Sequence, residues 1–220
     1  MLKLTGFCSI HRVLAVQWIA LGCVVSSALA QPQTQTNVWQ LDTAASELTV
    51  HVFKAGLFSG FLHDHMFIPG QWKATAKLDP GHLDDFHAEV SVAVASLKDN
   101  QQKLSAEDRA KVESQVIGPE VLDASRFTEI RFVADRLRVS TQKTDELEGT
   151  LSGKLSIHGV TKALDVPVHA WRRGDAQVVL GKVTFNQSDF GITPLHQAAG
   201  AIAVEDRVLV DFALRLVPSP

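Results

Sequence analysis

This 220-residue chain has no Tyr, only two Cys and no large net charge of either sign, since its formal net charge is −3. Both cysteines, Cys8 and Cys23, precede residue 31, so the rest of the chain can form no disulfide, no Cys-X-X-Cys redox pair and no cysteine nucleophile. The small negative charge and the lack of a basic stripe exclude nucleic acid as an expected partner.

Motifs of the common enzyme classes are also missing. The sequence contains no G-X-S-X-G elbow, phosphate loop, dinucleotide fingerprint or H-E-X-X-H pair. Hydrolysis by a spatially assembled His/Asp pair has no positive support. We therefore expect a protein that binds rather than catalyses.

The first thirty residues have the three parts of a secretory signal peptide. Lys3 and Arg12 are the only strong charges before residue 42, an apolar run covers 13–25, and an A-X-A pattern ends at Ala30. This run is shorter than the roughly 20 residues that a membrane span needs. We predict cleavage near Ala30 and a periplasmic or secreted mature protein. An uncleaved anchor and lipoprotein processing at Cys23 are the alternatives.

From residue 39 onward, apolar and polar residues alternate with a period of two. In 147–158 the odd-numbered positions are apolar or Gly and the even-numbered ones polar, which is typical of a strand with one face in a core and one in water. Residues 31–38 are a polar lead-in and 39–217 form the predicted domain. Eight antiparallel strands can close into a barrel without exposed edges. The strands are expected near 47–54, 65–78, 85–96, 128–139, 147–157, 162–171, 177–187 and 207–217.

One segment, 102–118, loses the period of two. Ser105 has the position of an N-cap, and Glu107 and Asp108 follow it in the first turn, where the helix dipole favours acids. The Gly-Pro pair at 118–119 ends the pattern. We predict one inserted α-helix that lies across an end or an open side of the barrel.

Three glycines, Gly149, Gly153 and Gly181, occupy positions on the apolar face where a core normally has a larger side chain. They allow two interpretations. Small residues let strands coil sharply in a closed barrel, and missing side chains leave volume inside, where an eight-stranded barrel can hold one small ligand.

Four segments together resemble a known family. These are LSIHGVTKALDVPV (155–168), FNQSDFGI (185–192), VLDASRFTEIRF (121–132) and WQLDTAASELTVHV (39–52). In their order along the chain and in their spacing, they are similar to the motifs of the YceI-like, polyisoprenoid-binding family.

The resemblance implies an all-β fold, an eight-stranded antiparallel lipocalin-like barrel. It also implies an exported binding protein that holds an isoprenoid lipid or quinone in its lumen as a carrier or in sequestration. We expect no other cofactor, and transient contact with a membrane or a membrane protein. The predicted lumen residues are Phe53, Phe132, Gly149, Leu151, Gly153, Leu155, Ile157, Val166, Val168, Val183, Phe185 and Phe190.

A histidine pair departs from the family pattern. His63 and His65 would point to one face of an extended segment. They could contact a polar ligand head group at the mouth of the cavity, or bind a metal completed by His51 or His196, or have no ligand. Two alternatives to lipid binding therefore stay open: a periplasmic metal- or haem-handling protein, and a structural or stress-related module whose barrel is solid.

Overall fold

The computed structural model describes residues 37–56, 64–78, 85–197 and 202–219. All of them belong to one compact unit, residues 34–220. The predicted signal peptide and His63 lie outside the described residues. Within the described ranges, no helix is both long and apolar enough to cross a membrane.

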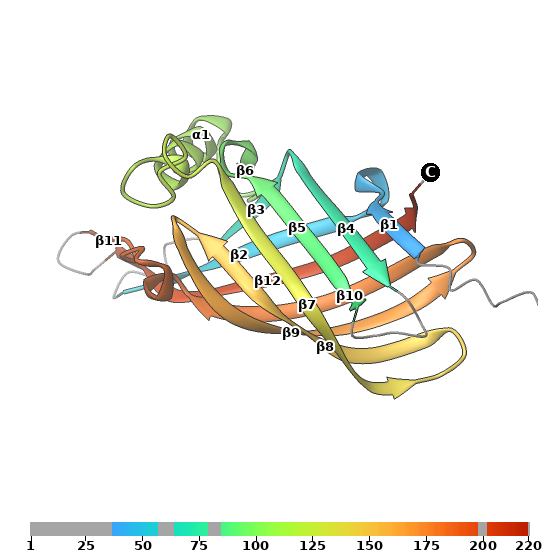
Figure 1. Ribbon diagram of the computed structural model, residues 1–220. Helices are drawn as coiled ribbons and strands as arrows, with labels where there is room; N and C mark the ends of the chain where they lie inside the picture. The colour runs from blue at the N-terminus through green and yellow to red at the C-terminus, as the bar shows by residue number, and fades with distance from the viewer. Residues whose placement is uncertain (1–36, 57–63, 79–84, 198–201, 220) are drawn as a thin grey trace, which may run out of the picture. The chain divides into compact units, whose positions relative to one another are not determined.

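Eight antiparallel strands form a closed barrel, as the sequence predicts (Figure 1). The ring closes because β1 pairs with β4 on one side and with β12 on the other. The strands follow one another around the barrel in this order: β1 (Asn37–Leu41), β4 (Trp72–Leu78), β5 (His87–Ala93), β7 (Glu129–Gln142), β8 (Glu146–Ile157), β9 (Val160–Arg173), β10 (Ala176–Asn186) and β12 (Ile202–Pro218).

Three further strands extend this sheet at one end, in the order β12–β2–β3–β6, and a fourth pairs with β12. They are β2 (Glu47–Ala55), β3 (His65–Pro69), β6 (Leu97–Asp99) and β11 (His196–Gln197). The single strand predicted over 65–78 is therefore wrong, since it is broken into β3 and β4. The strand predicted over 85–96 is present as β5 but ends at Ala93, and β6 is a separate short strand beyond it. The breaks face each other: the Gly70 N–H donates to the carbonyl of Ser96 (2.9 Å), at the end of the short 3-10 turn η4 (Val94–Ser96).

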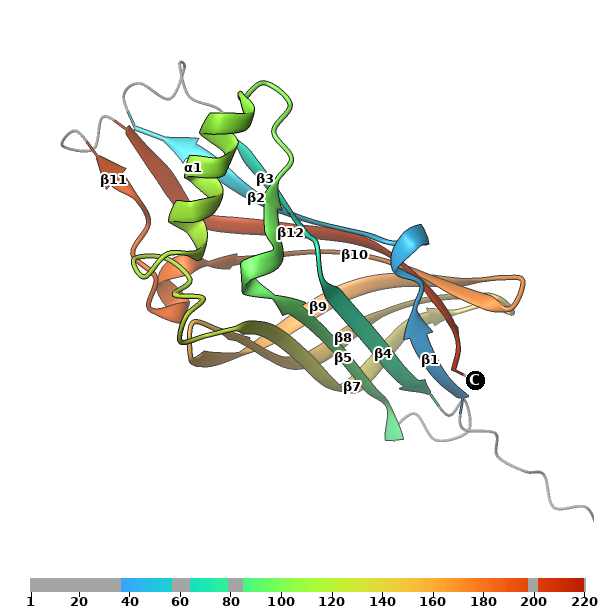
Figure 2. The same cartoon turned by 90° about the horizontal axis from the view of Figure 1, so that it is seen from above.

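The predicted helix is present as α1 (Ala106–Ile117). Ser105 is its N-cap, and the Ser105 hydroxyl accepts the N–H of Asp108 at 3.0 Å. The helix packs against β6, and the Glu113 carboxylate accepts the backbone N–H of Asp99 (3.0 Å) and pairs with Lys98 (2.9 Å). Figure 2 shows α1 at the same end as β3 and β11. We call this end the helix end.

The glycines on β8 bring two backbones together. An ideal Cβ on Gly153 would lie 2.3 Å from the carbonyl oxygen of Val133 on β7, and one on Gly149 would lie 2.6 Å from that of Arg138. The same pair of strands has register shifts between Ala134 and Arg136 and again further along. These two glycines therefore serve strand coiling, and the interpretation that they open volume in the lumen is wrong.

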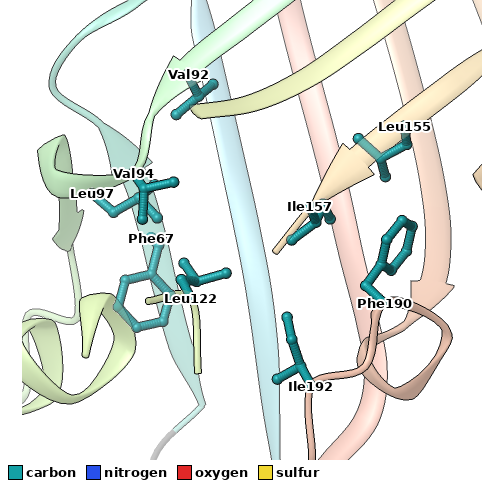
Figure 3. Packing of buried hydrophobic residues seen from close by; sticks show 9 residues of the cluster. All are labelled: Phe67, Val92, Val94, Leu97, Leu122, Leu155, Ile157, Phe190 and Ile192. Carbon is teal, nitrogen blue, oxygen red and sulfur yellow. The ribbon is translucent and has the colours of Figure 1, made fainter. Parts of the chain in front are cut away.

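Buried apolar side chains form two clusters. One, at the helix end, joins Phe67, Leu97 and Leu122 to Phe190 and Ile192, which approach from the other wall (Figure 3). The second consists of Ala74, Leu214 and Leu216, with partly buried neighbours that include Trp39 and Phe212. It lies toward the opposite end of the barrel, where β7 turns into β8, which we call the hairpin end. The two clusters are parts of the wall that surrounds the site described next.

A cavity inside the barrel as the candidate functional site

The barrel encloses a cavity of about 500 Å³. This volume lies within the range of roughly 300–1,000 Å³ that is typical of small-molecule sites. Apolar side chains from all eight strands of the ring make up most of its wall; they are mainly Leu, Val, Ile, Phe and Ala, and β1 contributes Trp39. The interior is hollow, so the solid-barrel alternative does not fit the described structure.

Most of the predicted lumen residues line this cavity. They are Phe132, Leu151, Leu155, Ile157, Val166, Val168, Val183, Phe185 and Phe190. Phe185 and Phe190 pack edge to face with ring centroids 5.4 Å apart. Phe190 is held in place by the 3-10 turn η5 (Gln187–Phe190), where Gln187 donates to the carbonyl of Glu205 (2.8 Å). The position of these residues is established, and their contact with a ligand stays a prediction.

Three predicted lumen residues, Phe53, Gly149 and Gly153, do not line the cavity. Phe53 lies on the face of β2 opposite to Val52, because successive side chains of a strand point to opposite faces. Its ring stacks on His51 (6.4 Å between centroids), and the Arg207 guanidinium lies 4.4 Å above it. The two glycines face the β7 backbone, as described above.

The rest of the wall was not predicted. It comes from β1 to β6, with Trp39, Val50, Val52 and Phe67 among its residues, and also from β12 and α1. The alternation of Leu48, Val50 and Val52 with polar residues carried the signal for β2, and Val52 rather than Phe53 was the residue on the apolar face. The wall residues of β3 and β4 lie in short, broken strands, where the period is too brief to assign a face.

Polar residues meet the cavity at the hairpin end, where the β7–β8 turn contributes 142–146 to its lining. Glu146 pairs with Lys143 (2.9 Å) and with His169 (2.7 Å). The hydrogen bond from Lys143, and next the one from His169, lowers the pKa of the Glu146 carboxyl below its usual range. This rim therefore carries a charged network at neutral pH.

At the helix end, the polar residues of the lining include His65, Gln115, Gln187 and Thr193. His65 Nδ1 lies 2.6 Å from Oδ2 of Asp99, whose side chain is fully buried. The other carboxylate oxygen of Asp99 accepts the backbone N–H of Gln101 at 2.8 Å. Asp99 was not predicted as a site residue. It lies 34 residues from His65 in the sequence, and no sequence pattern connects the two.

The histidines proposed to complete a metal site do not converge on His65. His65 pairs in register with Val52 and shares its inward face, whereas His51 points outward and bonds Asp211 at 2.6 Å. His196 bonds the carbonyl of Pro194 at 2.7 Å. The described residues contain no group of three or more His, Cys, Asp or Glu that could hold a metal. Since His63 lies outside them, the metal hypothesis stays untested.

Comparison with known families and structures agrees with this architecture. The family model described as the YceI-like domain matches residues 39–216. The chain belongs to the YceI-like domain family. The resemblance seen in the four sequence segments is thereby confirmed. A search of curated proteins finds no match to this sequence.

Several solved structures have the same fold. BcnA of Burkholderia cenocepacia aligns with a TM-score of 0.61 at 23% identity, over 80% of this chain and 98% of its own. A polyisoprenoid-binding domain from Saccharophagus degradans, implicated in plant cell wall breakdown, gives 0.57 at 13% identity, over 84% of this chain and all of its own. The YceI protein of Campylobacter jejuni gives 0.53 at 13%, over 70% and 84%.

Proposed function

We propose that this YceI-like protein is exported and holds an apolar lipid of the isoprenoid type, a prenyl lipid or a quinone, inside its barrel. The observation that carries this proposal is the cavity of about 500 Å³ with its almost wholly apolar wall. The polyisoprenoid-binding domain of Saccharophagus degradans, which has the same fold, supports the ligand class. The signal-like sequence of residues 1–30 supports export.

Burial of hydrocarbon is the source of affinity in such a site. Each methylene removed from water contributes about 0.8 kcal/mol, so ten of them contribute roughly 8 kcal/mol before the cost of ordering the chain and losing its free motion. A flexible isoprenoid chain needs no directional partners along its length. The described wall offers it Val, Leu, Ile and Phe on all sides.

The barrel also explains how the lipid would stay out of water. Because the eight strands close on themselves, the ligand can enter or leave only through an end. The helix end carries α1 and the hairpin end carries the Lys143–Glu146 rim. A protein of this kind suits carriage or sequestration of a lipid between membranes, with transient contact at a membrane surface during loading.

A pair of tryptophan variants tests whether the cavity is the binding site. Val183 lines the cavity, and Thr184, the next residue of β10, is exposed on the outer face. Val183→Trp should fill part of the lumen and weaken binding of geranylgeraniol at least about tenfold, a change of 1.4 kcal/mol. Thr184→Trp, the matched control, should bind like the wild type.

Both variants should remain folded, which thermal unfolding checks. Bound geranylgeraniol is quantified by mass spectrometry of organic extracts after gel filtration. A folded Val183→Trp variant that binds as well as the Thr184→Trp control would contradict the proposed site.

A further inference from the structure

The His65–Asp99 pair is one of the polar features at the helix end of the cavity, beside Gln115, Gln187 and Thr193. His65 lines the cavity and its ring stacks on Phe67 with centroids 6.0 Å apart. Its cross-strand neighbour Val52 also lines the cavity. The Asp99 side chain is fully buried behind the ring, so the pair presents only the imidazole to a ligand.

The hydrogen-bond partners determine which nitrogen of His65 carries the proton. A carboxylate has no proton to give and only accepts hydrogen bonds. The short contact from Nδ1 to Oδ2 of Asp99 therefore requires a proton on Nδ1. In the neutral imidazole, Nε2 then has a lone pair and acts as an acceptor.

Asp99 is held firmly in this role. Its Oδ1 accepts the N–H of Gln101, and its own backbone N–H donates to Glu113 on α1. Among the residues that the structure describes, none makes a hydrogen bond to Nε2 of His65. An acceptor at the wall of an apolar cavity is costly unless a donor reaches it.

We propose that His65 Nε2 accepts a hydrogen bond from a hydroxyl group of the bound lipid. The ligand is then a hydroxyl-bearing isoprenoid, a quinol or a prenol, with its head group at the helix end and its chain toward the hairpin end. An oxidised quinone has no O–H group, so its oxygens would place two acceptors against each other. This inference rests on the proposed function, since it requires the lipid to lie in the cavity.

The test compares one lipid in two redox states. A short-chain ubiquinone is titrated into the protein in its oxidised form and, under anaerobic conditions, in its reduced form. The wild type should bind the quinol about tenfold more tightly than the quinone. The quinol gains a hydrogen bond to His65 Nε2, whereas the quinone leaves this acceptor unpaired. His65→Phe should bind both forms with affinities equal within about twofold, because the variant keeps an aromatic ring at this position but loses the Nε2 acceptor.

We assign Asp99 the role of a positioning residue that sets the tautomer of His65. The variant Asp99→Asn distinguishes this role from a merely structural one. The new amide oxygen would keep the N–H of Gln101, so its NH₂ group would face His65 Nδ1. That arrangement moves the proton to Nε2 and makes it a donor. The variant should therefore reverse the preference and favour the quinone, a result that simple loss of packing does not produce.

A measurement on the unmodified protein covers the case in which a variant fails to fold. The ¹⁵N chemical shifts of the His65 ring should show a protonated Nδ1 and an unprotonated Nε2, and Nε2 should respond to addition of the quinol. A neutral ring protonated at Nε2 would overturn the inference.

The outcomes separate this inference from the proposed function. Equal binding of quinol and quinone by the wild type, or a preference that survives in His65→Phe, overturns the hydroxyl inference alone. If the wild type binds neither form and no geranylgeraniol, the inference and the proposed function fail together.

Discussion

Two glycine-to-alanine substitutions, Gly153→Ala and Gly181→Ala, should affect different properties of the protein. The first should lower its stability and the second its lipid binding, although the new Cβ atoms overlap their neighbours to nearly the same extent. A Cβ on Gly153 would lie 2.3 Å from the carbonyl oxygen of Val133, and one on Gly181 would lie 2.2 Å from Cζ of Phe212. The first obstacle is the backbone of a paired strand. The second is an aromatic ring that lines the cavity and can move into it.

The magnitudes follow from what each obstacle can do. At Gly153 the contact is about 1 Å short of ordinary van der Waals distance, which begins at 3.4 Å. Overpacking against a fixed neighbour costs about 1–3 kcal/mol, and the reduced entropy of the unfolded chain returns about 0.4–1 kcal/mol. The net loss of about 1–2 kcal/mol lowers the Tm by roughly 2–8 °C for a domain of this size.

At Gly181 the ring of Phe212 can turn away from the new methyl group, so the Tm should change by less than about 2 °C. The displaced ring takes up lumen volume, and we expect geranylgeraniol binding to weaken. Thermal unfolding followed by circular dichroism, together with the extraction assay, measures both effects. The reasoning is refuted if Gly153→Ala leaves the Tm unchanged or raises it, or if Gly181→Ala is the less stable of the two.

Two further substitutions test local features that support the cavity. Ser105→Ala removes the N-cap of α1 and should lower stability by about 1 kcal/mol, seen as a lower urea midpoint; Ser105→Thr, which keeps the hydroxyl that caps the helix and donates to Asp108, should restore it. Asp206 accepts the hydroxyl and the backbone N–H of Ser188 in η5, and these hydrogen bonds, the hydroxyl first, lower the pKa of its carboxyl from the usual 3.8. Since the folded pKa is depressed, its contribution is complete above pH 3.8 and is lost as the pH falls through the folded value. Asp206→Asn should therefore cost about 1 kcal/mol at neutral pH and show a weaker decline in stability than the wild type at acid pH; identical pH profiles would contradict this assignment.

The sequence predicted the parts of the fold in which local physics and tertiary packing agree. The alternation in β8 placed Leu151, Leu155 and Ile157 on the cavity face, because a closed barrel leaves a strand one apolar side. Ser105 and the acids after it marked the start of α1 to the residue. Both signals are short-range and require no knowledge of the partner strand.

The remaining features depend on which strands become neighbours. Gly149 and Gly153 have their role only because the β7 backbone lies against them, which one strand's sequence does not reveal. The break at Gly70 depends in the same way on its contact with Ser96. Asp99 becomes the partner of His65 only because β3 and β6 pair. The wrong placement of Phe53 is different, since its position next to Val52 already indicated the outer face.

The most direct test of lipid binding is mass spectrometry of organic extracts from the freshly purified protein, with the Val183→Trp variant prepared in parallel. We expect an isoprenoid lipid at about one molecule per wild-type chain and a clear reduction in the variant. A wild-type protein that carries no lipid and takes up none from an isoprenoid mixture would contradict the proposed function.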